Sequence, residues 1–259
     1  MRLGSLDITP ISDGFFKLPP AYFSQEDWGR HADLAAADGT IEIPIGCFLI
    51  RTGESTVLVD AGLGPIKTEQ FGGGALLDGL RDAGCAPEDV DLVLLTHLHL
   101  DHIGWTVQNG TAVFPNATVR FGSQDLGQFV YTDKPDPFSA PVVEVLEAAG
   151  CIEVIDDDGE VAPGISTLHA PGHTLGHRCV VLSSGDERAL LLGDTVTCPI
   201  QLEETDWGAM SDVDPQLAKR TRQAMFDELE GSGDLAIAAH FPGLEFGRVL
   251  RGEGKRYFA

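Results

Sequence analysis

The sequence contains few basic residues. Only 17 Lys and Arg stand against 40 Asp and Glu, which gives a formal net charge of −23, and no run of basic residues interrupts this excess. A surface of this sign repels a phosphate backbone. We therefore expect no nucleic-acid partner.

Long apolar segments are also absent. No stretch approaches the roughly 18 consecutive apolar residues that indicate a membrane-spanning helix. The first seven residues, MRLGSLD, lack the apolar core of a signal peptide. We therefore expect no membrane partner and a cytoplasmic location.

The cysteines show no CxxC pair. They are odd in number and scattered, which is typical of reduced thiols in a reducing compartment. Cys198 lies four residues after a candidate metal ligand, but we expect it, like the others, to be a small core residue. The five are Cys47, Cys85, Cys151, Cys179 and Cys198.

One short segment is dense in groups that bind metals. Residues 97–102 read HLHLDH and follow the apolar run 92–96, so that three of the eight histidines fall within six positions. Neutral imidazoles and carboxylates bind zinc and similar ions. If the run is a strand, His97 and His99 leave its end on one side, whereas Asp101 and His102 open the next turn and point elsewhere. Two ligand pairs with different directions suit two metals better than one.

Three later residues complete the pattern. His173 lies in a Gly-flanked turn between two predicted strands, Asp194 ends a strand, and His240 ends another. Every candidate ligand therefore lies at a strand end or in the turn that follows it. A common sheet edge is where distant segments build one site.

The predicted elements favour two sheets flanked by helices. The strands between 165 and 192 follow one another too closely for the helical crossovers of a doubly wound parallel sheet. Asp214 is the expected N-cap of the last helix, and Gly84 closes the first. Residues 1–40 show no strand or helix periodicity, and we interpret them as a lid or a dimer arm of a single domain, 1–259. Strands are expected at 45–51, 56–60, 92–97, 117–121, 151–155, 165–169, 179–183, 189–192 and 235–239, and helices at 75–83, 141–149 and 215–230.

In this order, the motifs resemble the metallo-β-lactamase superfamily, which has an early strand-end Asp, the HxHxDH cluster, a later His, an Asp and a last His. The resemblance spans residues 45–243 and implies an α/β fold, a four-layer αβ/βα sandwich of two mixed sheets flanked by helices. It implies two divalent ions, with Zn²⁺ expected and Mn, Co or Fe as alternatives. It assigns His97, His99 and His173 to one metal, Asp101, His102 and His240 to the other, Asp194 as the bridge, and Asp60 to a position behind the ligands.

Such a metal pair implies hydrolysis. Two cations about 3.5–4 Å apart lower the pKa of a shared water toward about 7, and the resulting bridging hydroxide is the expected nucleophile. Asp101 is the candidate catalytic residue that relays a proton to the leaving group. The segments 96–104, 193–194 and 239–243 are most similar to lactonases, esterases and organophosphate hydrolases. The expected partner is thus a small-molecule substrate, a largely apolar ester or lactone.

Several alternatives stay open. A phosphotriester is a second substrate class, and an oxidoreductase holding a single iron on His97, His99, His173 and Asp194 is a competing activity. Lactam-cleaving zinc enzymes commonly have Cys in place of Asp194, so β-lactams are disfavoured. Acyl-homoserine lactonases typically place a Tyr shortly after the bridging Asp, and residues 195–198, TVTC, contain none, which disfavours that substrate.

Other residues have two readings each. His177 either orients the His173 turn or packs, whereas His31 and His169 are expected to be structural or solvated. Trp105 forms either a pocket wall or part of the core. The aromatic and apolar residues of the two loops line an apolar mouth or form a homodimer surface. They are Phe15, Phe16, Tyr22, Phe23 and Trp28 in the first loop, and Ile200, Leu202, Trp207 and Met210 in the second.

Overall fold

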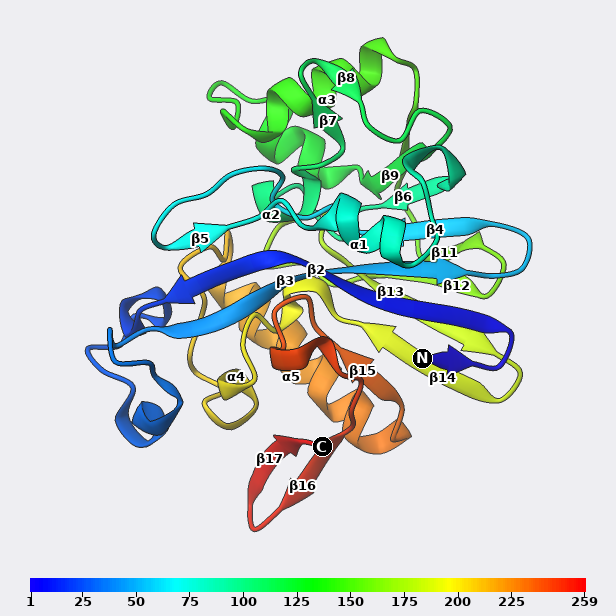
Figure 1. The fold of residues 1–259 in the computed structure, drawn as a ribbon. Helices are drawn as coiled ribbons and strands as arrows, with labels where there is room; N and C mark the ends of the chain where they lie inside the picture. The colour runs from blue at the N-terminus through cyan, green and yellow to red at the C-terminus, as the bar shows by residue number, and fades with distance from the viewer.

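Two sheets face each other at the centre of the computed structural model, which describes all residues from 1 to 259 (Figure 1). The first sheet is mixed: neighbouring strands are antiparallel from β1 to β4 and parallel from β4 to β10. Its strand order is β1 (Arg2–Leu3), β2 (Leu6–Leu18), β3 (Ile41–Arg51), β4 (Thr56–Val59), β6 (Leu92–Leu94), β9 (Thr118–Gly122) and β10 (Ile152–Ile155). The short strand β5 (Phe71–Gly72) pairs with β2. The second sheet has the order β11 (Gly159–Ala162), β12 (Ile165–His169), β13 (Arg178–Ser184), β14 (Glu187–Leu191) and β15 (Leu235–Ile237), and only β14 and β15 are parallel.

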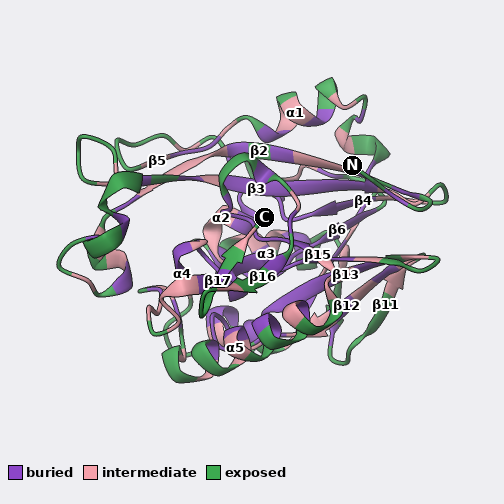
Figure 2. Cartoon of the chain, turned by 90° about the horizontal axis from the view of Figure 1, so that it is seen from below, coloured by how far each residue is buried: buried purple, intermediate pink, exposed green.

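Helices cover the outer face of each sheet, which confirms the four-layer sandwich. α1 (Leu76–Asp82) and α3 (Ser139–Ala148) pack on the first sheet, and α5 (Pro215–Ser232) packs on the second. In Figure 2 the strands between these helices are largely buried, and the outward surface of α5 is exposed. The remaining elements are the short helices α2 (Leu100–Ile103) and α4 (Ile200–Glu203) and the two hairpins β7 (Val107–Gln108) with β8 (Thr111–Ala112) and β16 (Val249–Gly252) with β17 (Lys255–Phe258).

Strand alternation divides the core into two layers. Along β3, Phe48 and Ile50 join the core between the sheets, whereas Cys47 and Leu49 join the core under α1 and α3. Successive side chains of a strand point to opposite faces, so that a strand buried on both sides reads as a continuous apolar run. This is why the chain has several short apolar runs. No helix of the structure combines the length and the apolarity that a bilayer crossing requires.

The prediction that the N-terminal segment is irregular was wrong for residues 6–18. They form β2, the longest strand, which pairs with β3 along its whole length. The register of the pairing shifts between Ser12 and Gly14, which marks a β-bulge. Because of this bulge, the apolar residues before and after it do not follow one alternating pattern, and the sequence does not show the period of two that is typical of a strand. The bulge turns Asp13 inward.

Asp13 connects β2 to three neighbouring loops. Its buried carboxylate accepts hydrogen bonds from the backbone N–H groups of residues 63, 64, 74 and 76 and from the indole of Trp105, at 2.8–3.1 Å. Five donors satisfy a charge that would otherwise be costly to bury. Trp105 is therefore a core aromatic, which decides between its two readings.

The other predicted elements are confirmed within a few residues. Asp214 caps α5 by accepting a hydrogen bond from the N–H of Leu217, and Gly84 follows α1 with a positive φ of 68°. β6 and β15 end three residues before His97 and His240, because the chain turns away from each sheet before it reaches the ligand. The histidines thus lie in loops and not on the strands themselves.

Candidate metal centre

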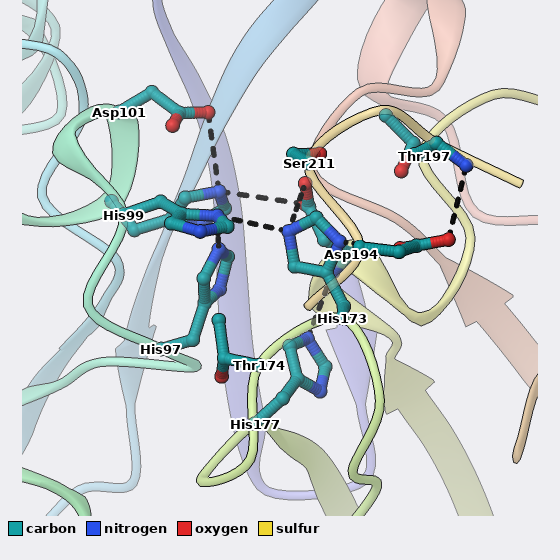
Figure 3. Close-up of polar contacts among 12 residues, drawn as sticks. His97, His99, Asp101, His173, Thr174, His177, Asp194, Thr197 and Ser211 are labelled. Carbon is teal, nitrogen blue, oxygen red and sulfur yellow. Dashed lines mark hydrogen bonds and ion pairs between the residues drawn. The ribbon is translucent and has the colours of Figure 1, made fainter. Parts of the chain in front are cut away.

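Seven side chains meet at one end of the two sheets, and they are the seven that the sequence analysis selected. Four come from residues 97–102 after β6, and the others follow strands of the second sheet, His173 between β12 and β13, Asp194 after β14 and His240 after β15 (Figure 3). Their ligand atoms form overlapping groups within 4.8 Å of one another. Both sheets are therefore needed to assemble the cluster.

The first ligand group consists of His97, His99 and His173. The Nε2 atom of His97 lies 2.9 Å from Nδ1 of His99, which lies 3.0 Å from Nε2 of His173. One carboxylate oxygen of Asp194, Oδ2, lies 3.4 Å from the same His173 nitrogen. Three imidazoles and one oxygen thus face a common point.

The second ligand group consists of Asp101, His102 and His240. Oδ2 of Asp101 lies 3.2 Å from Nε2 of His102 and 3.3 Å from Nε2 of His240. The other oxygen of Asp194, Oδ1, lies 3.4 Å and 3.3 Å from these two nitrogens. Asp194 therefore presents one oxygen to each group.

The separations in the second ligand group fit a bound cation. Tetrahedral ligands at the zinc distances of about 2.0–2.1 Å lie about 3.3 Å from one another, and the contacts in the second ligand group measure 3.2–3.4 Å. Nε2 of His102 and Oδ1 of Asp194 are buried and have no hydrogen-bond partner. An unpaired buried polar atom is costly, and a metal ion removes that cost at both atoms.

The rear nitrogens of the ligand histidines are held by other groups. Nδ1 of His102 lies 2.8 Å from the carboxylate of Asp60, and Nδ1 of His240 donates to the carbonyl oxygen of Pro44 at 2.7 Å. Such contacts fix the tautomer and direct the lone pair of Nε2 toward the metal position. Asp60 also accepts hydrogen bonds from the N–H and hydroxyl of Thr96, so it holds the start of the cluster.

Asp212 plays the same part for His173, and sequence reasoning missed it. Its Oδ1 lies 2.9 Å from Nδ1 of His173, and its Oδ2 accepts from the N–H of Ala209. Asp212 lies in a loop between α4 and α5, far from any ligand motif. Nothing in the local sequence distinguishes it from the other acidic residues of this chain.

His177 holds the backbone of Asp194 and not the His173 turn. Its Nε2 accepts a hydrogen bond from the N–H of Asp194 at 2.9 Å. The preceding Gly193 has a φ of 51°, and a Cβ on it would come within 2.6 Å of that imidazole nitrogen. Only glycine therefore brings the bridging residue into place here.

Asp125 connects two of the ligand loops. Its buried carboxylate accepts from the N–H of Leu98 at 3.1 Å, the hydroxyl of Thr174 at 3.0 Å and the N–H of Gly176 at 2.6 Å. Burial raises the pKa of Asp125 to about 6 although these donors oppose the shift. The residue fixes the 97–102 segment against the His173 turn.

The two ligand groups differ in charge preference. Burial and the neighbouring imidazoles lower the pKa of His97 well below its usual value and that of His99 to about 4. Burial also opposes charge on His240, but Asp194 and Asp101 outweigh it and raise its pKa to about 10. His97 and His99 of the first group thus favour the neutral form, whereas His240 of the second group favours the charged form.

A cavity of about 310 Å³ opens onto this cluster. Its floor includes His99, Asp101, Asp194 and His240, and its lining contains no Lys or Arg. The apolar walls come from β2 and β3 of the first sheet, the turn after β2, α2 and the loop before α3, and residues with hydroxyl groups join them from other segments. The remaining lining residues are Phe16, Leu18, Tyr22, Ile43, Leu100, Asp136, Phe138, Ser139, Thr197 and Ser211.

The loop aromatics divide between the cavity and a small core. Phe16 and Tyr22 line the cavity, whereas Phe23, Trp28 and Ile200 are buried together with Cys198, and Trp207 packs against them. Burial raises the pKa of Cys198 to about 11, which agrees with a packed thiol. Most of these side chains are thus covered within the chain, although Met210 is 73% exposed.

Two of the three histidines outside the cluster, His31 and His169, make structural contacts only. Nε2 of His31 lies 2.9 Å from Oε1 of Glu204. Nε2 of His169 lies 2.8 Å from the carbonyl oxygen of Leu175. Neither contacts the ligand groups.

Known proteins share this fold and part of this sequence. A family model described as the metallo-β-lactamase superfamily matches residues 42–108. An N-acyl homoserine lactonase of a Bacillus species is 25% identical over 169 residues, covering 59% of this chain but only 63% of the relative's length. The solved structure of AidC, a dizinc quorum-quenching lactonase in complex with a product, matches the whole chain and 95% of its own, with a TM-score of 0.90 and 23% identity. The hydrolase AbOPH of the β-lactamase superfamily also matches the whole chain and 94% of its own, with a TM-score of 0.86 and 25% identity.

Proposed function

We propose, from the premise that this chain belongs to the metallo-β-lactamase superfamily, that it is a dinuclear metal-dependent hydrolase of small, neutral lactones and esters. The observation that carries the proposal is the sharing of Asp194 between two complete ligand groups at the floor of an apolar cavity. When bound, two zinc-like ions supply Lewis-acid polarisation and an ionised water at neutral pH. The second ligand group gives the reason to prefer two ions to a single iron.

Residues of the chain position the metal ligands and the substrate. Asp194 fixes the two ligand groups relative to each other, and the cavity leads a substrate to their exposed side. Asp101 lines this cavity, and its side chain is 15% exposed, against 1% for His102. An Oδ oxygen of Asp101 can therefore accept the proton that the attacking water gives up and pass it to the leaving group.

The cavity lining supports neutral acyl substrates. It offers apolar walls and hydroxyl donors, whereas it has no Lys or Arg to pair with a substrate carboxylate or phosphate. The net charge of −23 adds a long-range repulsion of anions. Acyl homoserine lactones, the substrates named for the Bacillus relative, are uncharged and fit this lining, which returns them to the candidate substrates although residues 195–198 lack the Tyr of the acyl-homoserine lactonases.

The test is a substrate panel for the zinc-loaded protein. We expect turnover of acyl homoserine lactones, simple lactones and aryl esters, weaker turnover of a phosphotriester, and about two ions per chain by metal analysis. His97→Ala should abolish turnover, whereas His169→Ala, which changes a histidine outside the cluster, should not. Metal-loaded protein that hydrolyses none of these compounds contradicts the proposal, and one iron per chain would favour an oxidoreductase.

A further inference from the structure

A second cavity lies beside the catalytic one. Its volume is about 350 Å³, and its walls include the beginning of β3, α4 and β17. Ile43 belongs to the lining of both cavities, and it is the only residue that does. The two cavities are therefore neighbours, and the side chain of Ile43 stands between them.

Ile43 lies where one lining passes into the other along the first sheet. Phe16 is the register partner of Ile43 across β2 and β3, and Leu18 is that of Ile41. Register partners share a face of the sheet, so these four side chains lie side by side. Phe16 and Leu18 line only the catalytic cavity, whereas Ile41 lines only the second. The boundary between the two spaces thus runs through Ile43.

The segment after Asp194 passes from one cavity to the other in the same way. Thr197 lines the catalytic cavity and Cys198 lines the second, and Cys198 is buried in the same apolar cluster as Ile43. The side chain of Ile43 is only 1% exposed. No open passage therefore leads past it, and the packed cluster around Ile43 keeps the two spaces apart.

An apolar wall leads from the ligand groups to Ile43. The ring of Phe16 lies 5.8 Å from that of His240, and Ile43 follows Phe16 along this wall. The lining near α3, by contrast, includes the polar residues Asp136 and Ser139. An acyl chain whose carbonyl group lies at the ligand groups therefore has an apolar path along Phe16, and this path ends at Ile43.

The second cavity suits an apolar occupant. Glu203 in its lining pairs with Arg30 and Lys255. Arg256 pairs with two acidic residues of α5, and Glu42 is exposed to solvent. These charges are thus engaged by partners outside the lining or by water, and the apolar remainder can cover a hydrocarbon chain. It includes Leu34, Ile41, Ile200, Leu202 and Phe258.

We propose that Ile43 sets the longest acyl chain that this chain hydrolyses, because it closes the catalytic cavity against the second one. The inference rests on the proposed function and names its substrate class, lactones and esters with short acyl chains. A longer chain reaches Ile43 and has no space beyond it. Ile43 makes no contact with the reacting atoms and is therefore a specificity-determining residue.

The experiment measures kcat/KM for acyl homoserine lactones from butanoyl to dodecanoyl. The length ratio is kcat/KM for the dodecanoyl substrate divided by that for the butanoyl substrate. We expect a wild-type length ratio below about 0.1, and an increase of about 10-fold or more in Ile43→Ala, which joins the two cavities.

Ile41→Ala is the matched control, because it makes the same truncation on the same strand but lines only the second cavity. Both variants should have a lower Tm, since each loses buried apolar contacts. Only Ile43→Ala should change the length ratio by more than about threefold. Ile43→Val, a smaller truncation, should raise the ratio by a smaller factor and serves if Ile43→Ala does not fold.

Filling the second cavity gives an independent readout. Leu34 lines that cavity and is 56% exposed, so Leu34→Trp adds volume there without a change in the catalytic cavity. It should leave the wild-type length ratio unchanged but reverse the increase in the Ile43→Ala background. Such a coupling shows that the chain end enters this space.

Three results overturn the inference. They are a wild-type length ratio near one, an equal increase in Ile41→Ala and Ile43→Ala, and a Leu34→Trp change that leaves the Ile43→Ala ratio as it was. A wild-type protein that hydrolyses the butanoyl substrate but shows any of these results keeps the proposed function. Failure of the wild type on every substrate contradicts the proposed function itself.

Discussion

The two ligand groups share Asp194 but have opposite electrostatic surroundings. The first offers three imidazoles, and burial keeps the pKa of His99 down at about 4. The second includes Asp101, which together with Asp194 raises the pKa of His240 to about 10, whereas a carboxylate stands behind one histidine in each group, Asp60 behind His102 and Asp212 behind His173. A carboxylate neutralises part of the charge of a bound cation, whereas a neutral imidazole coordinates the cation without neutralising its charge. The difference predicts that the second group holds its ion more tightly than the first.

The largest expected effect comes from the residue that the two groups share. Asp194→Ala should lower lactone turnover at least about 1000-fold, because losing both ions removes several kcal/mol of transition-state stabilisation. Metal analysis after dialysis should show loss from both groups. Asp186→Ala, an exposed change in the turn before β14 and thus at the opposite end of that strand from Asp194, is the matched control. Retention of one full ion in Asp194→Ala would show that the groups are independent.

Single-ligand variants separate the two groups. His173→Ala and His240→Ala should each retain about one ion per chain and lose turnover about 100-fold or more. The ion that remains in His173→Ala should resist a chelator at higher concentrations than the ion that remains in His240→Ala. Zinc release monitored with a coloured indicator measures this order. Equal or reversed resistance contradicts the electrostatic comparison.

Substitution of the residues that hold the ligand histidines should have smaller effects on metal binding than substitution of the ligands themselves. Asp60→Asn and Asp212→Asn remove a charge that holds a ligand imidazole, and each should weaken metal affinity about 10- to 100-fold. Asp60→Asn should act on the second group and Asp212→Asn on the first. Competition with a chelator in each variant distinguishes these outcomes, and Asp206→Asn at the surface provides the baseline. The comparison fails if both changes affect the same ion.

Substitution of Asp125, which is not adjacent to the metal positions, should have the smallest effect on the metal affinity of either group. Its folded pKa of about 6 lies above the ordinary value of 3.8. Its contribution to stability is therefore fully present below the unfolded pKa and is lost as pH rises through about 6. Urea unfolding of metal-free protein should show this decline, by roughly 1–3 kcal/mol, in wild type and not in Asp125→Asn. Parallel pH profiles for the two proteins would contradict it.

The sequence predicted most of the site because each ligand follows an apolar strand. Residues 97–102, Asp194 and His240 come directly after runs whose period and length indicate buried strands, and sheet edges gather such positions. Asp212 gave no such signal, because its contact with His173 depends on where the loop between α4 and α5 folds back. β2 was missed for a related reason, since the bulge at Asp13 shifts its alternation. Local pattern thus predicts ligands and strands, whereas loop contacts require the structure.

The place of His240 after β15 has a consequence for how a new chain acquires its ions. His97, His99, His173 and Asp194 all precede α5, so a growing chain carries the complete first group before His240 is synthesised. The second group is complete only after α5 has crossed back and β15 has joined β14. Metal loading during synthesis should therefore begin at the weaker position, which is also the first to give up its ion in the mature protein.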